Sequence, residues 1–380
     1  MINRERMTDL FVRLASIDSH SKEEREVAEL LARELRELGA EVRSDDAGRA
    51  VAGNSGNLIA RIGGTQPGAA PLMLCAHMDT VPPGKGVKAV RDNGCIRSDG
   101  STILGGDDKS GLAIIVEVLR SLSERSVPHG DIEVAFTICE EIGLLGAKQL
   151  DVGALASRRA LVLDSSSAST LVTRGPAADR FEFVIHGLES HAGIAPEQGI
   201  SAVRVAAEAI AAMPLGRVDP QTTSNVVIAE CTPATNVVPN RVAVRGEARS
   251  LDTARLDELM AVIRRCFQDA AARAKTVAGE TEQRAWLEER CAREYESIDV
   301  PDSDPLVQLV IAAGAREDRE IRTASIGGGS DANVLQQRGI TSVNLGTGMR
   351  DIHTVNEWLD LADFYACADI VLRVLQLAAA

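Results

Sequence analysis

The sequence has little of what several large protein classes depend on. Aromatic residues make up only 3% of its 380 residues, and the two tryptophans, Trp286 and Trp358, show no stacking pattern. Lysine and arginine (41) are outnumbered by aspartate and glutamate (55), so the formal net charge is -14. This balance argues against a nucleic-acid partner, because phosphate binding needs clustered basic side chains. No run of about 18 apolar residues occurs, so we expect no transmembrane helix and no membrane partner.

Cysteine is also sparse and irregular. The seven cysteines are scattered from Cys75 to Cys367 without paired spacing, which is typical of reduced thiols rather than of a disulfide framework. Residues 1–6 lead into a charged amphipathic segment and lack the apolar stretch of a signal peptide. These features predict a cytoplasmic protein.

What is present indicates an α/β fold. Helical apolar spacing at 7–17, 23–38 and 109–122 alternates with strand-like segments at 57–62, 72–76, 132–139 and 161–164. We expect 95–98 to be an edge strand. Several of the strand-like segments end in polar residues. Such alternation predicts a sheet with a functional site at the carboxyl ends of its strands.

The pattern changes near residues 174–176. Strands are expected at 181–185, 222–230, 241–249 and 284–295, with helices at 196–213 and 251–274, which is an α+β arrangement. Residues 302–305 mark a return to the first pattern. We therefore predict a catalytic domain formed by residues 1–177 and 297–380, with a smaller domain, residues 178–296, inserted into it.

The strand at 72–76 leads directly into His77 and Asp79. Residues two apart in a strand point to the same side, so both side chains can enter one crevice. A neutral imidazole suits a zinc-like ion, and a neighbouring carboxylate can hold its other ring N–H. For one such pair alone, a histidine that only hydrogen-bonds an acid is the more ordinary explanation.

Further acids and a second histidine follow at comparable places. Asp107 and Asp108 lie at the start of a helix, where acids also serve as caps. Two adjacent carboxylates follow the strand at 132–139, and single polar residues follow later segments: Glu140, Glu141, Asp164 and His353. Burying such acids is costly unless a cation lies among them. Two histidines with several carboxylates fit zinc, cobalt or manganese, and the glycine-rich loop before Asp107 makes it the best candidate for a carboxylate that bridges two ions.

These motifs, in this order along the chain, resemble the co-catalytic zinc metallopeptidase family that contains peptidase T, glutamate carboxypeptidase and aminoacylase. The segments at 104–111 and 140–144 are most similar to the peptidase T branch, a tripeptide aminopeptidase, although that branch more usually has alanine where Gly106 stands. The resemblance implies a three-layer catalytic domain with a mixed sheet and an inserted ferredoxin-like α+β lid. It also implies two divalent ions per subunit, with zinc first and cobalt or manganese as alternatives.

The resemblance assigns a role to each matching residue. It implies a first ion held by His77, Asp107 and Asp164, and a second held by Asp107, Glu141 and His353. Asp79 would orient His77, Glu140 would be the general base, and the Asp107–Asp108 peptide bond would be cis. In the lid, the resemblance implies that His191 stabilises the oxyanion. Substrate contacts would come from Asn236, Arg249, Gly328 and Ser330. A solvated arginine, a histidine that ends a strand and a plain glycine turn are the ordinary alternatives for this last set.

The expected activity is hydrolysis of a peptide or amide bond in a short peptide. Two ions would activate a water molecule, whose proton Glu140 accepts and passes to the leaving amine. An aminopeptidase acting on di- and tripeptides, working as a homodimer through the lid, is the first expectation. A carboxypeptidase or an N-acyl amino acid amidohydrolase with the same centre is the second. A metal-binding protein without catalysis is the third.

Overall fold

A computed structural model describes residues 2–231, 234–278 and 281–380 of the chain. The contacts divide it into two units. The first comprises the chain up to Gly175 and from Ile298 onward, and the second is Pro176–Ser297. No helix within the described ranges is both long enough and apolar enough to cross a bilayer.

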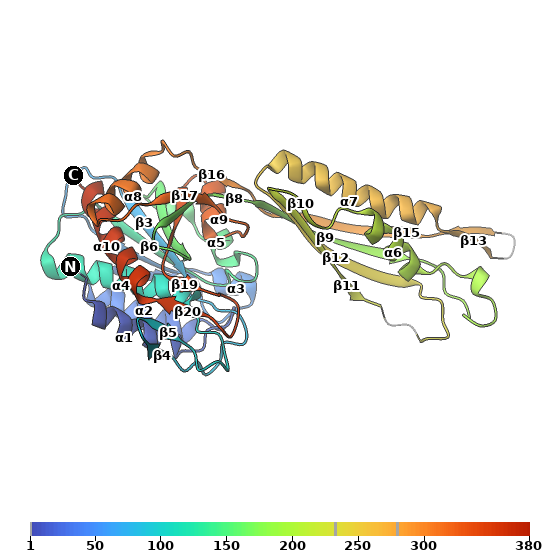
Figure 1. Cartoon of the computed structure of the whole chain (residues 1–380), viewed down its shortest axis with the longest axis horizontal. Coiled ribbons are helices and arrows are strands. Elements are labelled where there is room, and N and C mark those ends of the chain that lie inside the picture. The colour runs from blue at the N-terminus through green and yellow to red at the C-terminus, as the bar shows by residue number, and fades with distance from the viewer. Residues whose placement is uncertain (1, 232–233, 279–280) are drawn as a thin grey trace. The chain divides into compact units, whose positions relative to one another are not determined.

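A mixed sheet is the centre of the first unit (Figure 1). Among the described residues it has nine strands, in the spatial order β1-β2-β6-β3-β7-β18-β8-β16, with β17 paired to β8. The strands are β1 (Glu41–Ser44), β2 (Leu58–Ile62), β3 (Leu72–His77), β6 (Ile132–Thr137), β7 (Arg159–Ser165), β8 (Thr170–Gly175), β16 (Ile298–Asp299), β17 (Arg322–Ser325) and β18 (Thr341–Gly346). The neighbours β6, β3, β7 and β18 are mutually parallel, so their carboxyl ends share one edge.

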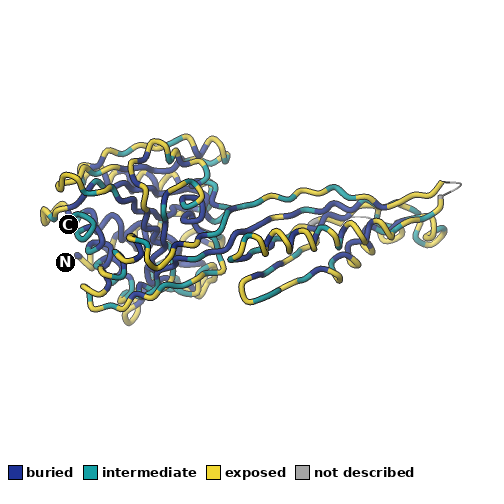
Figure 2. Tube along the Cα trace, turned by 90° about the horizontal axis from the view of Figure 1, so that it is seen from above, coloured by how far each residue is buried: buried dark blue, intermediate teal, exposed yellow. Residues whose placement is uncertain are grey.

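Helices cover both faces of this sheet. On one face lie α1 (Arg4–Ala15), α2 (Arg25–Glu37), α4 (Gly106–Arg125), α8 (Pro305–Arg316) and α10 (Leu361–Ala378). On the other lie α3 (Ala47–Val51), α5 (Leu145–Gln149) and α9 (Asp331–Gln337). The central strands are buried along their whole length, as Figure 2 shows for the first unit. This three-layer arrangement confirms the α/β class expected from the alternating pattern.

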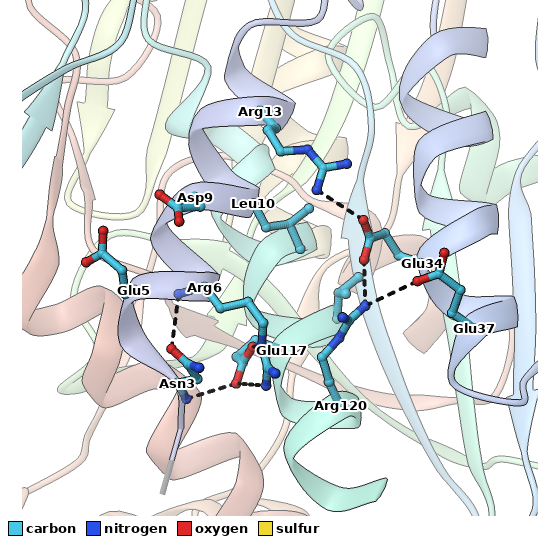
Figure 3. A pocket seen from close by; sticks show the side chains of 11 residues that line it. Asn3, Glu5, Arg6, Asp9, Leu10, Arg13, Glu34, Glu37, Glu117 and Arg120 are labelled. Carbon is cyan, nitrogen blue, oxygen red and sulfur yellow. Dashed lines mark hydrogen bonds and ion pairs between the residues drawn. The ribbon is translucent and has the colours of Figure 1, made fainter. Parts of the chain in front are cut away.

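Figure 3 shows how α1 is held against α4. Glu117 of α4, whose side chain is 2% exposed, accepts hydrogen bonds from the guanidinium of Arg6 at 2.7 and 2.9 Å. It also accepts one from the backbone N–H of Asn3 at 2.9 Å. The acid is therefore buried with its hydrogen-bond partners in place, as a buried charge requires.

One expected strand is in a different place. The segment expected at 95–98 as an edge strand is β5 (Cys95–Arg97), and it does not pair with the central sheet. It belongs to a separate four-stranded sheet with β4 (Val90–Asp92), β19 (Met349–Arg350) and β20 (Trp358–Asp360). In that sheet β5 lies between β4 and β20, so it is not an edge strand. The prediction was wrong because strand patterns are local, whereas the partner β20 lies more than two hundred residues later in the chain.

The second unit is a layered α+β structure. Its antiparallel sheet has the order β10-β11-β12-β9-β15, and a two-stranded ribbon lies beside it. The strands are β9 (Ala177–His186), β10 (Gly216–Asp219), β11 (Thr222–Glu230), β12 (Arg241–Ser250), β13 (Lys275–Ala278), β14 (Thr281–Arg284) and β15 (Trp286–Tyr295). Helices α6 (Ala202–Ala212) and α7 (Thr253–Arg273) pack on one face of the sheet, where Phe183 stacks on Phe267 with ring centroids 4.2 Å apart.

Candidate metal centre

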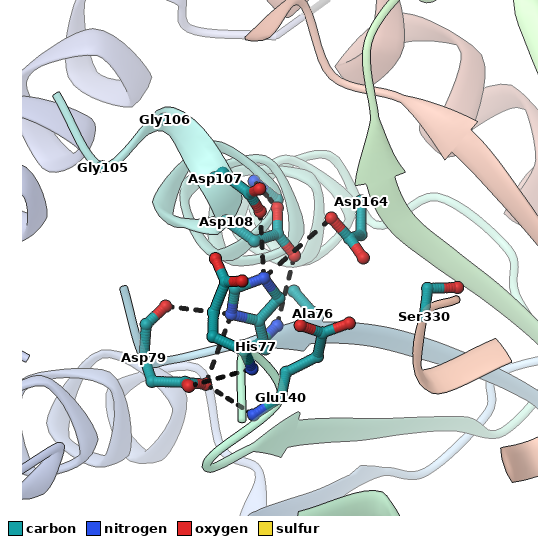
Figure 4. A network of polar contacts seen from close by, with 12 residues as sticks. Ala76, His77, Asp79, Gly105, Gly106, Asp107, Asp108, Glu140, Asp164 and Ser330 are labelled. Atoms are coloured by element: carbon teal, nitrogen blue, oxygen red, sulfur yellow. Dashed lines mark hydrogen bonds and ion pairs between the residues drawn. The ribbon is translucent and has the colours of Figure 1, made fainter. Parts of the chain in front are cut away.

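His77, the last residue of β3, lies among carboxylates that come from other segments (Figure 4). Its Nε2 atom is 3.0 Å from Oδ1 of Asp107 and 3.9 Å from Oδ1 of Asp164. Asp164 belongs to β7, the parallel neighbour of β3, and Asp107 lies at the start of α4. The carboxyl ends of adjacent parallel strands therefore bring these groups together, as expected from the sequence.

His353 approaches Asp107 from the other side. Its Nε2 atom is 3.1 Å from Oδ2 of Asp107 and 3.0 Å from Oε1 of Glu141. The two oxygens of the Asp107 carboxylate thus face two different imidazoles, Oδ1 toward His77 and Oδ2 toward His353. A carboxylate in this arrangement has the geometry to bridge two ions.

Three groups of side chains here offer ligand atoms that all lie within 4.8 Å of one another. They are His77 with Asp107 and Asp164, His77 with Glu140 and Glu141, and Asp107 with Glu141 and His353. The donors are nitrogen and oxygen atoms, the set that zinc, cobalt and manganese accept. Four carboxylates face two imidazoles, so an excess of negative charge remains that divalent cations would neutralise. The residues present therefore fit a pair of such ions.

The pKa shifts describe the same excess of negative charge. Burial raises the pKa of Glu140 and of Asp164. Burial would also raise the pKa of Asp107, but its contacts with His353 and His77 outweigh burial and lower it. The carboxylates of Asp107 and Glu141 raise the pKa of His353 to about 10. The raised pKa values of the acids show that their ionised forms are unfavourable without a cation nearby. The shifts of Asp107 and His353 show that a positive charge is stabilised among them, as at a site that holds cations.

Asp79 supports the loop after β6 as well as His77. The Nδ1 atom of His77 is 2.9 Å from the backbone oxygen of Asp79 and 3.4 Å from its carboxylate. That carboxylate accepts hydrogen bonds from the backbone N–H groups of Glu140 at 2.9 Å and Glu141 at 3.2 Å. It also accepts the hydroxyl of Ser21 at 2.6 Å. Asp79 therefore fixes His77 and both adjacent glutamates at once.

Two residues that the sequence did not single out complete this support. Glu24 accepts a hydrogen bond from the N–H of Cys139 at 3.0 Å, and Asn57 accepts one from the N–H of Ile138 at 3.1 Å. Together with Asp79, they bind the four consecutive amides from Ile138 to Glu141. The sequence carries no local sign of this, because Glu24 reads as part of a helix start and Asn57 as part of a strand.

The segment that carries Asp107 has an irregular backbone. The Asp107–Asp108 peptide bond is cis, which confirms that implication of the resemblance. Asp107 and Asp108 have non-helical dihedral angles, and Gly105 before them has φ +75°. The buried carboxylate of Asp108, which was not assigned a role from the sequence, accepts the N–H of His77 at 3.1 Å. Asp108 thus links the start of α4 to the end of β3.

Ser330 lies near this edge of the sheet, at the N-terminus of α9 (Figure 4). Its Oγ atom is 3.4 Å from the side-chain nitrogen of Asn344, which also donates to the backbone oxygen of Asp164 at 2.7 Å. Ser330 is 2% exposed, whereas a Cβ added at Gly328 would meet no atom within 4 Å. Gly328 therefore has the open space around it that a ligand contact needs, and Ser330 has less.

The remaining candidates belong to the second unit. His191 and Asn236 are exposed and lie on paired segments, with the N–H of Ala192 donating to the backbone oxygen of Asn236 at 2.9 Å. Both segments adjoin Arg241, the first residue of β12. Arg249 lies eight residues further along that strand, roughly 26 Å away at strand spacing. The structure therefore brings His191 and Asn236 together but leaves Arg249 at the opposite end of the sheet.

Comparisons with known proteins agree with this picture. Residues 73–377 match the model of peptidase family M20/M25/M40. The chain is 37% identical over 380 residues to an uncharacterized protein of Bacillus subtilis, YqjE, with 100% of both covered. The crystal structure of aminopeptidase PepT from Bacillus cereus superposes with a TM-score of 0.89 at 36% identity over 100% of each chain. A tripeptidase from Staphylococcus aureus gives a TM-score of 0.91 at 33% identity, covering 100% of this chain and 99% of that one.

Proposed function

The chain belongs to peptidase family M20/M25/M40, and from this membership we propose that it is a metal-dependent aminopeptidase that releases the N-terminal residue of short peptides. The similarity to PepT and to the tripeptidase supports the peptidase T branch within the family. The observation that carries the proposal is the Asp107 carboxylate, whose two oxygens lie 3.0 and 3.1 Å from two different imidazoles.

We assign the first ion to His77, Asp107 and Asp164 and the second to Asp107, Glu141 and His353, with zinc as the proposed metal. Two of the three ligand groups at the site support this division. When bound, such a pair of ions polarises the scissile carbonyl and lowers the pKa of a water molecule. The chain contributes the rigid spacing, because strand ends and buried hydrogen bonds fix each ligand before the ions bind.

Glu140 is the proposed general base. It lies beside His77 in the third ligand group, is 8% exposed, and is held at its backbone N–H by Asp79. Burial raises the pKa of its carboxyl, which makes the carboxylate a better proton acceptor. Glu140 takes a proton from the attacking water and delivers it to the leaving amine.

The second unit supplies the proposed groups for recognition. His191 would stabilise the oxyanion, and Asn236 and Arg249 would bind the substrate backbone and its carboxylate. Gly328 and Ser330 of the first unit are the further proposed substrate contacts. An extended tripeptide spans about 10 Å, whereas roughly 26 Å of strand separates the two ends of the sheet. If His191 and Arg249 contact one substrate, they therefore belong to two copies, which supports a homodimer through this unit.

The dimer is tested by mixing inactive variants. If the sites are shared, a mixed dimer of one His191→Ala chain and one Arg249→Ala chain carries both lesions in the same site, so its other site stays intact. Random assortment should restore about a quarter of the wild-type activity. No recovery after confirmed subunit exchange would contradict shared sites.

A cytoplasmic location is proposed from the thiols. All seven cysteines lie in the described ranges and are free, as in a reducing compartment. Retention of these thiols in protein isolated without reductant would support this location, and stoichiometric disulfides would contradict it.

The activity is tested by digesting a peptide library while the metal content of the same sample is measured. We expect release of N-terminal residues, a preference for tripeptides over longer chains, and about two ions per chain. An acetylated amino acid serves as the control substrate, since an aminopeptidase needs a free amino group. Cleavage of that control, or release of C-terminal residues, would contradict the aminopeptidase assignment and leave the metal centre standing.

A further inference from the structure

Glu357 is a buried acid whose hydrogen bonds converge on the loop that carries Asp107. The residue is 1% exposed. Its Oε2 atom accepts the backbone N–H groups of Leu104 and Gly105, each at 2.8 Å. Its Oε1 atom accepts the N–H of Asp107 at 3.0 Å. One carboxylate thus binds three of the four backbone N–H groups from Leu104 to Asp107.

This loop needs such an acceptor. Leu104, Gly105 and Asp107 are buried, and their N–H groups lie outside any strand and at the start of α4, where no preceding helical turn supplies acceptors. A buried N–H without a partner costs about 1–3 kcal/mol, so three of them in succession require acceptors in place. An ionised carboxylate suits this position because it offers acceptors only.

Glu357 comes from the same turn as His353. Its own N–H donates to the backbone oxygen of Thr354 at 3.1 Å, and the residue directly precedes β20. One side chain therefore connects the loop of Asp107 with the loop of His353. The contact is close, since a Cβ added at Gly106 would lie 3.1 Å from Oε1 of Glu357.

We propose that Glu357 is a positioning residue for the second ion, setting the distance between Asp107 and His353 through the backbone of residues 104–107. The inference rests on the proposed function, because the second ion is part of that proposal. Glu357 contacts no substrate and needs to contact no ion. Its effect arises because hydrogen bonds that orient ligands typically govern metal affinity.

Two substitutions separate position from charge. Glu357→Gln keeps the length of the side chain, but its amide nitrogen cannot accept, so at least one of the three backbone N–H groups loses its partner. Glu357→Asp keeps the negative charge but withdraws the carboxylate by one methylene. A role in positioning predicts that both variants are impaired, whereas a role through charge alone predicts that only the glutamine variant is.

Glu133 provides a matched control. It is 4% exposed, lies on β6 at the other end of the same sheet, and accepts the N–H groups of Ala156 at 3.0 Å and Ser157 at 2.8 Å. Glu133→Gln therefore removes a buried acid that binds backbone amides without touching the candidate centre. It reports the effect of lost stability alone.

The experiment titrates each metal-free protein with Co²⁺ against a chromophoric chelator and records the visible absorption of the bound ion. We expect Glu357→Gln and Glu357→Asp to weaken one of the two binding steps by about 10–100-fold and to change its spectrum, while Glu133→Gln binds like wild type. Circular dichroism confirms folding, and Glu357→Asp carries the test if the glutamine variant does not fold.

The outcomes distinguish this inference from the proposed function. If wild type binds two ions and both Glu357 variants bind them equally well, the positioning role is wrong and the metal centre stands. If Glu357→Asp binds like wild type and only Glu357→Gln is weakened, charge rather than position is responsible, and the inference is overturned. If wild type binds no Co²⁺, the proposed function itself fails.

Discussion

In the first unit, Asp107 and Glu140 are buried carboxylates among imidazoles and backbone amides. In the second unit, by contrast, Glu182 of β9 lies between two arginines whose side chains are 65% and 73% exposed. An exposed ion pair stabilises a protein by about 0–1 kcal/mol and tolerates substitution. A buried acid without a partner costs far more, so its surroundings must be complete. The contrast supports placing the proposed chemistry in the first unit.

The largest effect should follow removal of the shared carboxylate. Asp107→Asn keeps the size of the side chain but replaces one anionic oxygen with a nitrogen that cannot bridge, so the metal content should fall from about two ions per chain to less than one, and peptidase activity to background. Metal analysis after desalting measures this. Glu182→Gln is the same change of acid to amide in the second unit and should retain both ions. Equal metal content in the two variants would remove the distinction between the units.

The next effect separates binding from catalysis within the first unit. Glu140→Gln should retain both ions, because Glu140 lies outside the two assigned ligand sets, yet lower kcat by about 10²–10⁴-fold through loss of the proton acceptor. Steady-state kinetics with a tripeptide, alongside metal analysis, measures both quantities. Loss of an ion in this variant would instead make Glu140 a ligand, as the third ligand group allows.

A pH-dependent effect is expected at Asp331, which is 2% exposed. Its Oδ2 accepts the hydroxyl of Thr137, while its Oδ1 has no partner among the described residues, and burial raises its pKa from 3.8 to about 6. Between these values the folded state holds more protons than the unfolded state. Asp331 therefore lowers the free energy of unfolding as pH rises through this interval, by up to about 1.4 kcal/mol for each pH unit.

Asp331→Asn removes this titration and places an N–H₂ group at the position of Oδ1. The variant should therefore gain in Tm relative to wild type as pH rises from 4 through about 6, when both are measured by thermal unfolding with chelator present. A difference in Tm that is the same at every pH would contradict the assignment of the titration to Asp331.

The smallest pair of effects compares the ion pairs of the two units directly. Glu117→Gln should cost about 1–3 kcal/mol, because its amide nitrogen cannot accept, so one of the part-buried hydrogen bonds from Arg6 or Asn3 is lost (Figure 3). Glu208→Gln breaks the exposed pair with Arg204, whose side chains are 41% and 82% exposed, and should cost less than about 0.5 kcal/mol. Urea unfolding measures both, and equal costs would contradict the contrast.

Much of the site could be predicted because its parts are local patterns. An apolar segment that ends in an acid or a histidine marks both a strand and its carboxyl end, and parallel strands gather such ends at one edge. This reasoning placed His77, Asp164 and the pair Glu140 and Glu141 correctly at that edge. The segment at Cys95 was expected to be an edge strand but lies between β4 and β20, because a short apolar segment does not reveal its partners.

The supporting contacts could not be predicted. Glu24 and Cys139 are 115 residues apart in the chain, and Glu357 and Asp107 are 250 residues apart. Each contact joins a side-chain oxygen to a backbone N–H, and every residue except proline has such a group. The sequence around Glu24 or Glu357 therefore contains nothing that identifies the partner.

By itself, the sequence determined which donors this protein has, the order in which they occur, and the elements that carry them, because the periods of strands and helices are properties of neighbouring residues. Only the tertiary structure decided that the two oxygens of Asp107 face different imidazoles and that buried acids bind the loops around them. The reason is physical: distances of about 3 Å between remote segments depend on how the whole sheet and its helices pack.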